Sequence, residues 1–595
     1  MKTDTLPKWD LNKFFPGLAS PVFEDALGAW GTAIDHAELW MAGQALDIPA
    51  SSADQVKLLE AMISTYNALS DEGELLSAYV YAHVSTDSTD DLAARKESDL
   101  NVQLSRFRKW VKQMNRWIGA MNSEGIQAES QIARDHAFAI QRAETEARHQ
   151  LSAGEESLIS DLELTGSVAW SRLRSSLTSQ LEVSVDHGKG EEILPMSAVR
   201  ALAYDPDREI RRLAYHAELA AWPQVEVAVA EAMNGVKGEI GLLARRRGWG
   251  SPLNEAIFDA NIDEQTLSAM LESARAAFPH FRRYLKAKAR HMGAEHLPWF
   301  DLFAPIGKEA KSWSYEEAIE FVAEQFGTYS PKMREFALRS HRENWTDAEP
   351  RSGKIDGAFC MLVQGDESRI LMNFKPSFGS VSTLAHELGH GYHNLCLKSR
   401  TALQRVTPNT LAETASIFCE TIIRQAAQSQ GSPQERLAVL EASLQGSTQV
   451  VVDITSRFDF ESAVFKARDT GTLRAKEYCD LMTAAQLGTY GDGLDAAMLH
   501  PYMWAAKPHY YGKSFYNFPY MFGLLFALGL YAIYQQEPEP FRAKYDDLLS
   551  STGKADAATL ASTFGIDVRR SAFWEGSLST IKKDVDDFEA IINAQ

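Results

Sequence analysis

Residues 382–396 read STLAHELGHGYHNLC, and this stretch decides how the rest of the chain is interpreted. It contains an HExxH pattern made of His386, Glu387 and His390. On an α-helix, residues four apart lie on the same face, so both imidazoles can bind one metal ion. Glu387 lies about 100° further round the helix, where its carboxylate can take a proton from water without being a ligand. The pattern predicts a zinc-binding helix with Glu387 as general base.

A catalytic zinc ion has three protein ligands and one open position, so a third ligand is needed. His393 lies on the same face, but one short helical stretch does not easily supply three tetrahedral ligands. A helper or packing role is the better interpretation of His393. Metzincins need a glycine at 393 and a histidine at 396, and His393 and Cys396 exclude that class. The alternative for the HExxH pair is two ordinary hydrogen-bonded histidines.

A second predicted helix supplies the third ligand. Thr407 and Pro408 are typical of a helix start, and the helix continues through ETASIFCE, residues 413–420. Glu413 and Glu420 are seven residues apart, share one face and have apolar neighbours, and buried carboxylates need partners. We expect Glu413 to be the third ligand and Glu420 to accept a hydrogen bond from a ligand imidazole. The alternative for each is a surface carboxylate or a buried ion pair.

The composition is that of a soluble globular protein, with 595 residues, of which 45% are hydrophobic and 24% charged. Asp and Glu (80) outnumber Lys and Arg (60), so the formal net charge is −20. An acidic surface repels phosphate groups, so we expect no nucleic-acid partner and no membrane binding. The four cysteines include no CxxC pair, and residues 1–15 lack an apolar core of signal-peptide length. We expect a cytoplasmic protein, either a monomer or a homodimer.

Most of the chain shows apolar residues at three- and four-residue spacing, which predicts helices. The segment 125–160 is expected to form one long solvent-facing helix. Residues 514–536 carry no charge, but their Gly, Pro, Asn and Tyr residues favour a buried core helix over a membrane span. The remaining expected helices are 20–48, 54–85, 92–122, about 207–246, 263–293, 314–342, 411–428, 433–467 and 474–488.

Only two regions are typical of strands. Residues 181–187 predict a short strand followed by a turn. Residues 357–363 and 369–374 flank the turn QGDES and predict a hairpin just before the HExxH helix. The expected fold is therefore mainly α, with a small β-hairpin or sheet beside the HExxH helix.

The sequence resembles peptidase family M3, the zinc oligopeptidases, and within it the oligoendopeptidase F branch. The resemblance implies a large, two-lobed helical metallopeptidase with a deep channel, which hydrolyses internal bonds of short unstructured peptides. It implies one zinc ion per chain, held by His386, His390 and Glu413. We expect an N-terminal helical domain over 1–195 and a catalytic domain over 196–595. The motifs that carry the resemblance are HELGHGYH (386–393), ETASIFCE (413–420), WDLNKFFPG (9–17), HLPWFDLFAPIG (296–307), RSGKIDGAFC (351–360) and HYYGKSFYNFPY (509–520).

The aromatic segment 509–520 is where we expect hydrogen-bond donors for the reaction. Phenol and imidazole groups can donate to a developing oxyanion or to substrate carbonyls. His509 and Tyr516 are candidate catalytic residues, and Tyr510 and Tyr511 are candidate substrate-binding residues. The alternative is that these side chains belong to the core.

The predicted hairpin is a candidate for substrate binding, because an exposed edge strand pairs with an extended peptide through main-chain hydrogen bonds. Gly357 would permit close approach of a backbone, and Ala358 follows it. The alternative is an ordinary covered hairpin.

Two rival functions fit the sequence less well. A non-catalytic helical peptide-binding protein has no reason to keep His386, Glu387, His390 and Glu413 together. A serine hydrolase of the GxSxG type is not indicated, because no such pattern occurs. Cobalt or manganese could occupy the same ligands in place of zinc.

Overall fold

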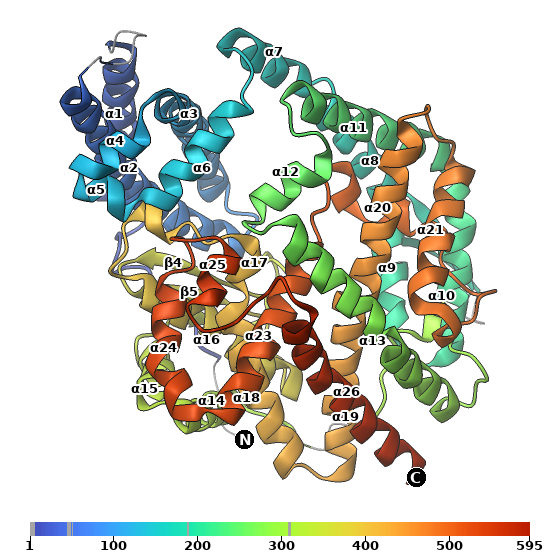
Figure 1. The fold of residues 1–595 in the computed structure, drawn as a ribbon. Coiled ribbons are helices and arrows are strands. Elements are labelled where there is room, and N and C mark those ends of the chain that lie inside the picture. The colour runs from blue at the N-terminus through green and yellow to red at the C-terminus, as the bar shows by residue number, and fades with distance from the viewer. Residues whose placement is uncertain (1–5, 44–48, 50, 187–189, 308–310, 595) are drawn as a thin grey trace. The chain divides into compact units, whose positions relative to one another are not determined.

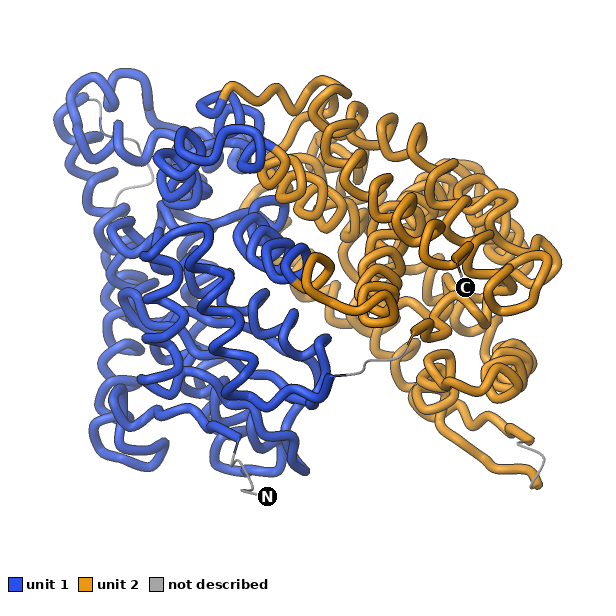
Figure 2. The backbone as a smooth tube through the Cα atoms, turned by 90° about the horizontal axis from the view of Figure 1, so that it is seen from below, with its two compact units in different colours: residues 1–150, 311–426, 533–564 blue, residues 151–310, 427–532, 565–595 orange. Residues whose placement is uncertain are grey.

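The computed structural model describes residues 6–43, 49, 51–186, 190–307 and 311–594. It is mainly helical, with helices labelled α1 to α26 and two small sheets, as expected (Figure 1). The chain forms two compact units, and Figure 2 colours unit 1 blue and unit 2 orange. Unit 1 comprises 1–150, 311–426 and 533–564; unit 2 comprises 151–310, 427–532 and 565–595.

The predicted division at residue 195 is a single cut along the chain, whereas each compact unit is built from three separate segments. Helices that are distant in sequence complete the same core, so compactness does not follow chain order. The division into 1–195 and 196–595 stays a prediction, as does the deep channel.

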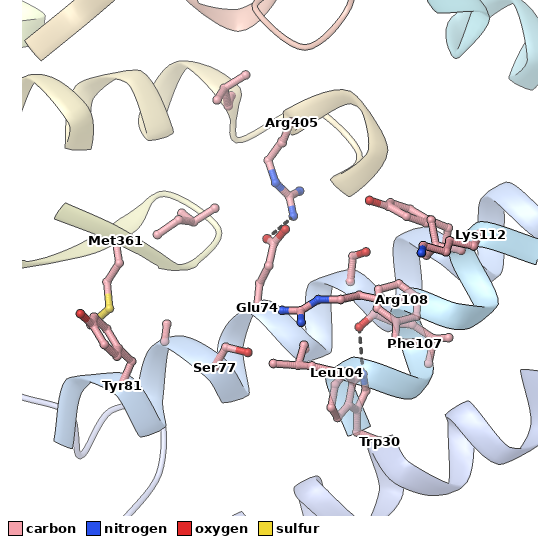
Figure 3. Close-up of a pocket in the computed structure, with 18 of the residues that line it drawn as sticks. Trp30, Glu74, Ser77, Tyr81, Leu104, Phe107, Arg108, Lys112, Met361 and Arg405 are labelled. Carbon is pink, nitrogen blue, oxygen red and sulfur yellow. Dashed lines mark hydrogen bonds and ion pairs between the residues drawn. The ribbon is translucent and has the colours of Figure 1, made fainter. Parts of the chain in front are cut away.

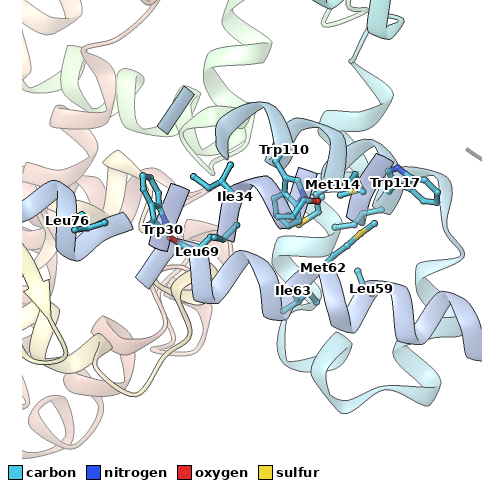
Figure 4. Close-up of a cluster of buried hydrophobic side chains, with 14 of the residues drawn as sticks. Trp30, Ile34, Leu59, Met62, Ile63, Leu69, Leu76, Trp110, Met114 and Trp117 are labelled. Carbon is cyan, nitrogen blue, oxygen red and sulfur yellow. Dashed lines mark hydrogen bonds between the residues drawn. The ribbon is translucent and has the colours of Figure 1, made fainter. Parts of the chain in front are cut away.

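Unit 1 begins with three long helices, α1 (Pro21–Gly43), α2 (Ser52–Thr86) and α3 (Asp91–Ala120). Their apolar stripes meet in one cluster of large buried side chains (Figure 4). The indole N–H of Trp30 donates to the carbonyl of Leu69, so the one polar atom of this buried ring is satisfied. The labelled members of the cluster are Trp30, Ile34, Leu59, Met62, Ile63, Leu69, Leu76, Trp110, Met114 and Trp117.

The prediction of one long helix over 125–160 is wrong, because the chain there forms four short helices. The Ser130 side chain accepts a hydrogen bond from the Ala133 N–H and so starts a new helix. Ser152 and Glu155 form a reciprocal capping box that starts another. Hydrogen bonds between these polar side chains and the backbone compete with the hydrogen bonds of a continuous helix. The four helices are α4 (Ser123–Glu129), α5 (Gln131–Asp135), α6 (Ala137–Arg148) and α7 (Ala153–Glu163).

The middle segment of unit 1 carries a three-stranded sheet. The predicted hairpin is confirmed as β4 (Phe359–Gln364) and β5 (Glu367–Leu371), paired antiparallel. A two-residue strand, β3 (Thr346–Asp347), adds to β5 in parallel and was not predicted. The order is β3-β5-β4, which leaves β4 at one edge.

The helices around this sheet enclose the HExxH segment. The expected helix 314–342 is divided at Ser330 and Pro331 into α14 (Tyr315–Tyr329) and α15 (Pro331–Arg342). The HExxH residues lie on α16 (Phe378–Leu397), which packs against β4, β5, α14 and α24 (Pro538–Ser550). The short helix α17 (Asn409–Ala412) leads into α18 (Thr414–Gln430), and α25 (Ala557–Ser562) completes the unit.

Unit 2 is also helical, with one hairpin. The strand predicted over 181–187 is β1 (Glu182–Asp186), which pairs with β2 (Glu191–Pro195); His187 lies outside the described residues. The expected run 433–467 is continuous, because a π-helical turn (Gln449–Asp453) joins α19 to α20. The helices are α7, whose bounds are given above, and α8 (Ser167–Ser179), α9 (Met196–Ala201), α10 (Arg208–Ala221), α11 (Glu226–Arg246), α12 (Pro252–Asp259), α13 (Glu264–His291), α19 (Pro433–Thr448), α20 (Ile454–Arg468), α21 (Ala475–Tyr490), α22 (Met503–Ala506), α23 (Phe518–Gln536) and α26 (Ser571–Asn593).

Helix α23 is long and apolar enough to cross a membrane by length and composition alone, and it is the one such helix among the described residues. In this structure 72% of its most apolar window is buried inside the protein. This burial is typical of a core helix, which is what residues 514–536 predict.

Candidate metal centre

Three side chains of unit 1 converge as a ligand set: His386, His390 and Glu413. Glu413 Oε2 lies 3.3 Å from His386 Nε2 and 3.4 Å from His390 Nε2. One ligand atom from each residue lies within 4.8 Å of the other two. Two neutral imidazoles and a carboxylate are the donor set of several catalytic zinc sites. The arrangement therefore fits a metal ion with one open position.

The two helices that carry these ligands approach closely at Gly389. A Cβ atom built on Gly389 would lie 2.6 Å from Ser416 Cα and 2.7 Å from the Ala415 carbonyl oxygen. Any larger residue would push α18 away from α16. The glycine inside the HExxH pattern is thus required by packing, a role that its position in a helical pattern could have signalled.

The second helix differs from its prediction at Glu413 itself. The expected continuous helix ends with α17 at Ala412, and Glu413 lies between α17 and α18 with φ −86° and ψ 3°. The Ser416 hydroxyl donates to Glu413 Oε2 at 2.7 Å, a contact that sequence reasoning missed. The break and this hydrogen bond together orient the carboxylate toward the imidazoles.

The charges of the three residues depend strongly on one another. Burial opposes ionisation of Glu413, but hydrogen bonds with His386 and His390 outweigh it and hold its pKa well below the usual range. Burial likewise opposes protonation of His386, but the carboxylates of Glu413 and Glu420 raise its pKa to about 10. A metal cation bound between these residues would stabilise the ionised carboxylates in place of a protonated imidazole.

Glu387 lies beside the ligands but is not one of the converging set. Its side chain is 5% exposed, and its Oε2 has no hydrogen-bond partner among the described residues. Burial raises the pKa of this carboxyl, which makes it a better proton acceptor than an ordinary glutamate. A buried carboxylate oxygen without a partner is costly unless a ligand or substrate supplies one.

Glu420 contacts the outer nitrogen of a ligand imidazole, as the sequence predicts. Its Oε2 lies 3.3 Å from His386 Nδ1, and its Oε1 accepts a hydrogen bond from the Ser382 hydroxyl at 3.2 Å. This contact fixes which nitrogen of His386 carries the hydrogen, so that Nε2 is free to bind a metal.

The Glu420→Gln variant should bind zinc about 10–100-fold more weakly than the wild type, because the amide no longer makes the imidazole more basic. Competition with a chromophoric chelator measures this affinity. Glu324→Gln, an exposed change on α14, is the matched control and should bind as the wild type does. Equal affinity in the Glu420 and Glu324 variants would show that the contact with His386 has no effect on the metal.

His393 points away from the ligand set. Its Nε2 lies 2.9 Å from Thr552 Oγ1 and 3.1 Å from the Leu549 carbonyl oxygen. The side chain is 4% exposed, and burial lowers its pKa to about 4. These contacts support the packing role for His393.

Stability should therefore fall in mild acid. Between pH 6.5 and about 4 the unfolded chain binds a proton at this histidine and the folded chain does not. The free energy of unfolding should thus decrease as pH falls through this range, by up to roughly 3 kcal/mol. Urea unfolding of the metal-free chain at several pH values measures this free energy. In His393→Asn the free energy of unfolding should depend less steeply on pH. His291→Asn, a change at an exposed position, should retain the wild-type dependence of the free energy of unfolding on pH. If His393→Asn shows the same pH dependence as the wild type, His393 is not the cause of the loss of stability.

The hairpin borders an open groove of about 880 Å³ in unit 1 (Figure 3). Met361 and Leu362 of β4 line it, with Tyr81 beside Met361 and Phe107 from α3. A Glu74–Arg405 ion pair of 2.8 Å also borders the groove. Gly357, just before β4, has φ +89°, and a Cβ atom added to it would meet no other atom within 4 Å, so the space above it is open. Ala358 follows, half-buried.

The residues predicted from the aromatic segment lie in unit 2, whereas the ligand set lies in unit 1. The His509 and Tyr516 rings stack with centroids 5.3 Å apart, and the Tyr516 hydroxyl lies 2.7 Å from that of Tyr520. Tyr510 packs on Phe460 with ring centroids 5.0 Å apart. The guanidinium of Arg174 lies 5.3 Å from the centre of the Tyr511 ring.

These contacts separate the four residues into two pairs. Tyr510 and Tyr511 are each 1% exposed and packed within unit 2, which agrees with the core alternative. His509 and Tyr516 are only half-buried, and burial lowers the pKa of His509, which favours its neutral form. Roles of the four residues in catalysis or substrate binding stay predictions.

Family models and curated relatives that match this sequence are peptidases. The model of peptidase family M3 matches residues 201–580, and a second model, described as oligopeptidase F, matches residues 121–182. Group B oligopeptidase PepB of Streptococcus agalactiae is 22% identical over 98% of this chain and 97% of its own. Oligopeptidase PepF of Bacillus subtilis is 21% identical over 92% of this chain and 83% of its own.

Solved structures share the fold. A protein from Chlamydophila abortus has a TM-score of 0.82 at 18% identity, with 98% of both chains covered. Oligoendopeptidase-F from Enterococcus faecium has a TM-score of 0.69 at 18% identity, with 96% of this chain and 99% of its own covered. The protein is a metallopeptidase, a hydrolase of peptide bonds. The chain belongs to peptidase family M3, with the oligoendopeptidase F group as its relatives.

Proposed function

We propose that the chain is a zinc-dependent oligoendopeptidase, which cleaves internal bonds of short unstructured peptides with Glu387 as general base. The observation that carries the proposal is the convergence of His386, His390 and Glu413 beside the buried carboxylate of Glu387, whose Oε2 has no hydrogen-bond partner among the described residues. Nitrogen and oxygen donors in this number favour zinc over magnesium or calcium, which prefer oxygen ligands alone. We propose one zinc ion per chain and a cytoplasmic location.

A bound zinc ion supplies Lewis acidity: it makes water a stronger nucleophile at neutral pH and polarises the scissile carbonyl. Glu387 takes the proton of the attacking water, and its raised pKa suits that task. The same carboxyl then passes the proton to the departing amine, since it lies buried and no residue that the structure describes competes for a hydrogen bond at Oε2. His509 and Tyr516 are our candidates for donors to the carbonyl oxygen, carried by the other unit.

The substrate is proposed to bind beside the hairpin. Gly357 and Ala358 lead into β4, the edge strand, whose free side can pair with an extended peptide. Met361, Tyr81 and Phe107 line the groove and offer apolar surface to peptide side chains. Main-chain pairing of this kind accepts many sequences but requires an unstructured substrate.

Internally quenched peptides with acetylated amino ends and amidated carboxyl ends test this proposal. We expect cleavage of such blocked peptides at internal bonds, and no cleavage of a folded protein that contains the same segment. Mass spectrometry of the products locates the cuts. If only peptides with a free terminus are cleaved, the chain is an exopeptidase and not an endopeptidase.

A further inference from the structure

Unit 2 contains a second cavity, of about 310 Å³, formed only by residues of that unit. Helices α9 and α10 line one part of it, and the π-helical turn and α22 line another. Its volume lies at the lower end of the range of roughly 300–1,000 Å³ that small-molecule sites occupy. Aromatic rings form much of the wall: Tyr204, Tyr215, Trp299, Phe300 and Phe303.

Most charged groups on this wall already have partners. Arg211 donates to Asp301 at 2.8 Å and to the carbonyl of Asp205 at 2.6 Å. Arg200 donates to Glu218 at 2.6 Å, and Asp453 accepts from Arg457 at 2.8 Å. Each of these anions is thus matched by at least one cation, and Asp301 is matched by two, since Arg208 also donates to it at 2.7 Å.

Two groups on the same wall are left over. The ammonium group of Lys507 makes no ion pair and no hydrogen bond with any residue that the structure describes. Burial lowers the pKa of its ammonium group to about 8, as expected for a desolvated cation without its own carboxylate. His500 is 1% exposed, and its Nδ1 has no hydrogen-bond partner among the described residues.

Both ring nitrogens of His500 are available to a ligand. His500 Nε2 lies 3.1 Å from Glu218 Oε1, but neither Nε2 nor Nδ1 makes a hydrogen bond with any residue that the structure describes. A neutral imidazole has one N–H donor and one acceptor nitrogen. The cavity therefore presents one unpaired ammonium group and one imidazole whose N–H can donate to a bound anion.

We propose that this cavity binds a small organic carboxylate, held by an ion pair with Lys507 and a hydrogen bond from His500, with its apolar part against the aromatic wall. The excess of positive charge that remains beyond the internal ion pairs selects an anion. The aromatic rings select an organic anion over a hydrated inorganic one, because their apolar faces can pack against its hydrocarbon part. Neither the metal ligands nor the proposed general base takes part.

Isothermal titration calorimetry with phenylacetate and hexanoate tests the proposal on the full chain. Their uncharged amides and inorganic phosphate are titrated separately for comparison. We expect both carboxylates to bind the wild type and the amides to bind at least about tenfold more weakly, since a charge-assisted hydrogen bond is lost. Lys507→Met should weaken carboxylate binding by about tenfold or more, and Lys507→Arg should retain most of it. Lys476→Met removes a lysine whose side chain is 82% exposed on α21 and should bind as the wild type does.

A second measurement does not depend on any lysine variant. In the wild type labelled with ¹⁵N-histidine, the ring-nitrogen resonances of His500 should shift when carboxylate is added, and His500→Gln assigns those signals. Equal affinities of the wild type and Lys507→Met would overturn the proposal. Binding of phosphate but neither carboxylate would also overturn it, as would a cavity that takes up no anion and holds water only.

Discussion

Replacing Glu387 with glutamine should lower kcat by about 10²–10⁴-fold while the chain keeps its metal. Glutamine has nearly the same shape, but its amide cannot accept the proton of the attacking water. The change corresponds to roughly 3–5 kcal/mol of lost transition-state stabilisation. Because Oε2 of Glu387 makes no hydrogen bond with any described residue, the variant should fold as the wild type does. Cleavage of a blocked, quenched peptide and metal analysis of the same sample measure both properties.

Glu316→Gln is the matched control, since it makes the same chemical change at an exposed position of α14. It should retain full turnover and full metal content. A Glu387 variant that still turns over within a few-fold of this control would remove Glu387 from the reaction. A variant that loses its metal together with its activity would make Glu387 a ligand or a support of the ligands instead.

Replacing Glu413 with alanine should abolish metal binding at stoichiometric zinc, and activity with it. Two imidazoles from one helix remain, and the only anionic ligand is lost. The loss of affinity should exceed the roughly 10–100-fold expected when a hydrogen-bonding partner of a ligand is removed, as in the Glu420 variant. Metal content after gel filtration and activity at one equivalent of zinc provide the two readouts.

The comparison of the two glutamate variants is informative, because both residues contact His386. Excess zinc should restore activity to Glu420→Gln, whose ligand set is complete, but not to Glu413→Ala. If excess zinc restores both equally, Glu413 is not a ligand. If neither recovers, Glu420 is also needed to bind the metal.

The sequence predicts much of this fold where periodicity is strong and uninterrupted. The hairpin at β4 and β5 and the helix α16 follow from alternating and 3.6-residue patterns. The long helix expected over 125–160 fails because hydrogen bonds from Ser130 and from the Ser152 capping box compete with the helical backbone. Composition does not distinguish a solvent-facing helix from several short capped ones.

The candidate site is predicted more completely than the fold around it. HExxH spacing places two imidazoles together without any knowledge of the fold, and a second helix rich in glutamate supplies a partner. Two features escape this reasoning: the helix break at Glu413 and the hydrogen bond from the Ser416 hydroxyl to the Glu413 carboxylate. Both depend on the local geometry between α17 and α18, which residue spacing does not determine. The roles of His509 and Tyr516 depend on the other unit and were inferred from residue type.

Titration of the metal-free chain with zinc tests the central claim most directly. The chain is stripped with a chelator, and the initial rate of cleavage of a blocked, quenched peptide is followed at protein concentrations far above the dissociation constant. The account predicts no cleavage without metal, a linear rise in rate, and a sharp end point at one zinc ion per chain. Full activity of the metal-free chain, or a rate that zinc does not raise, would contradict it.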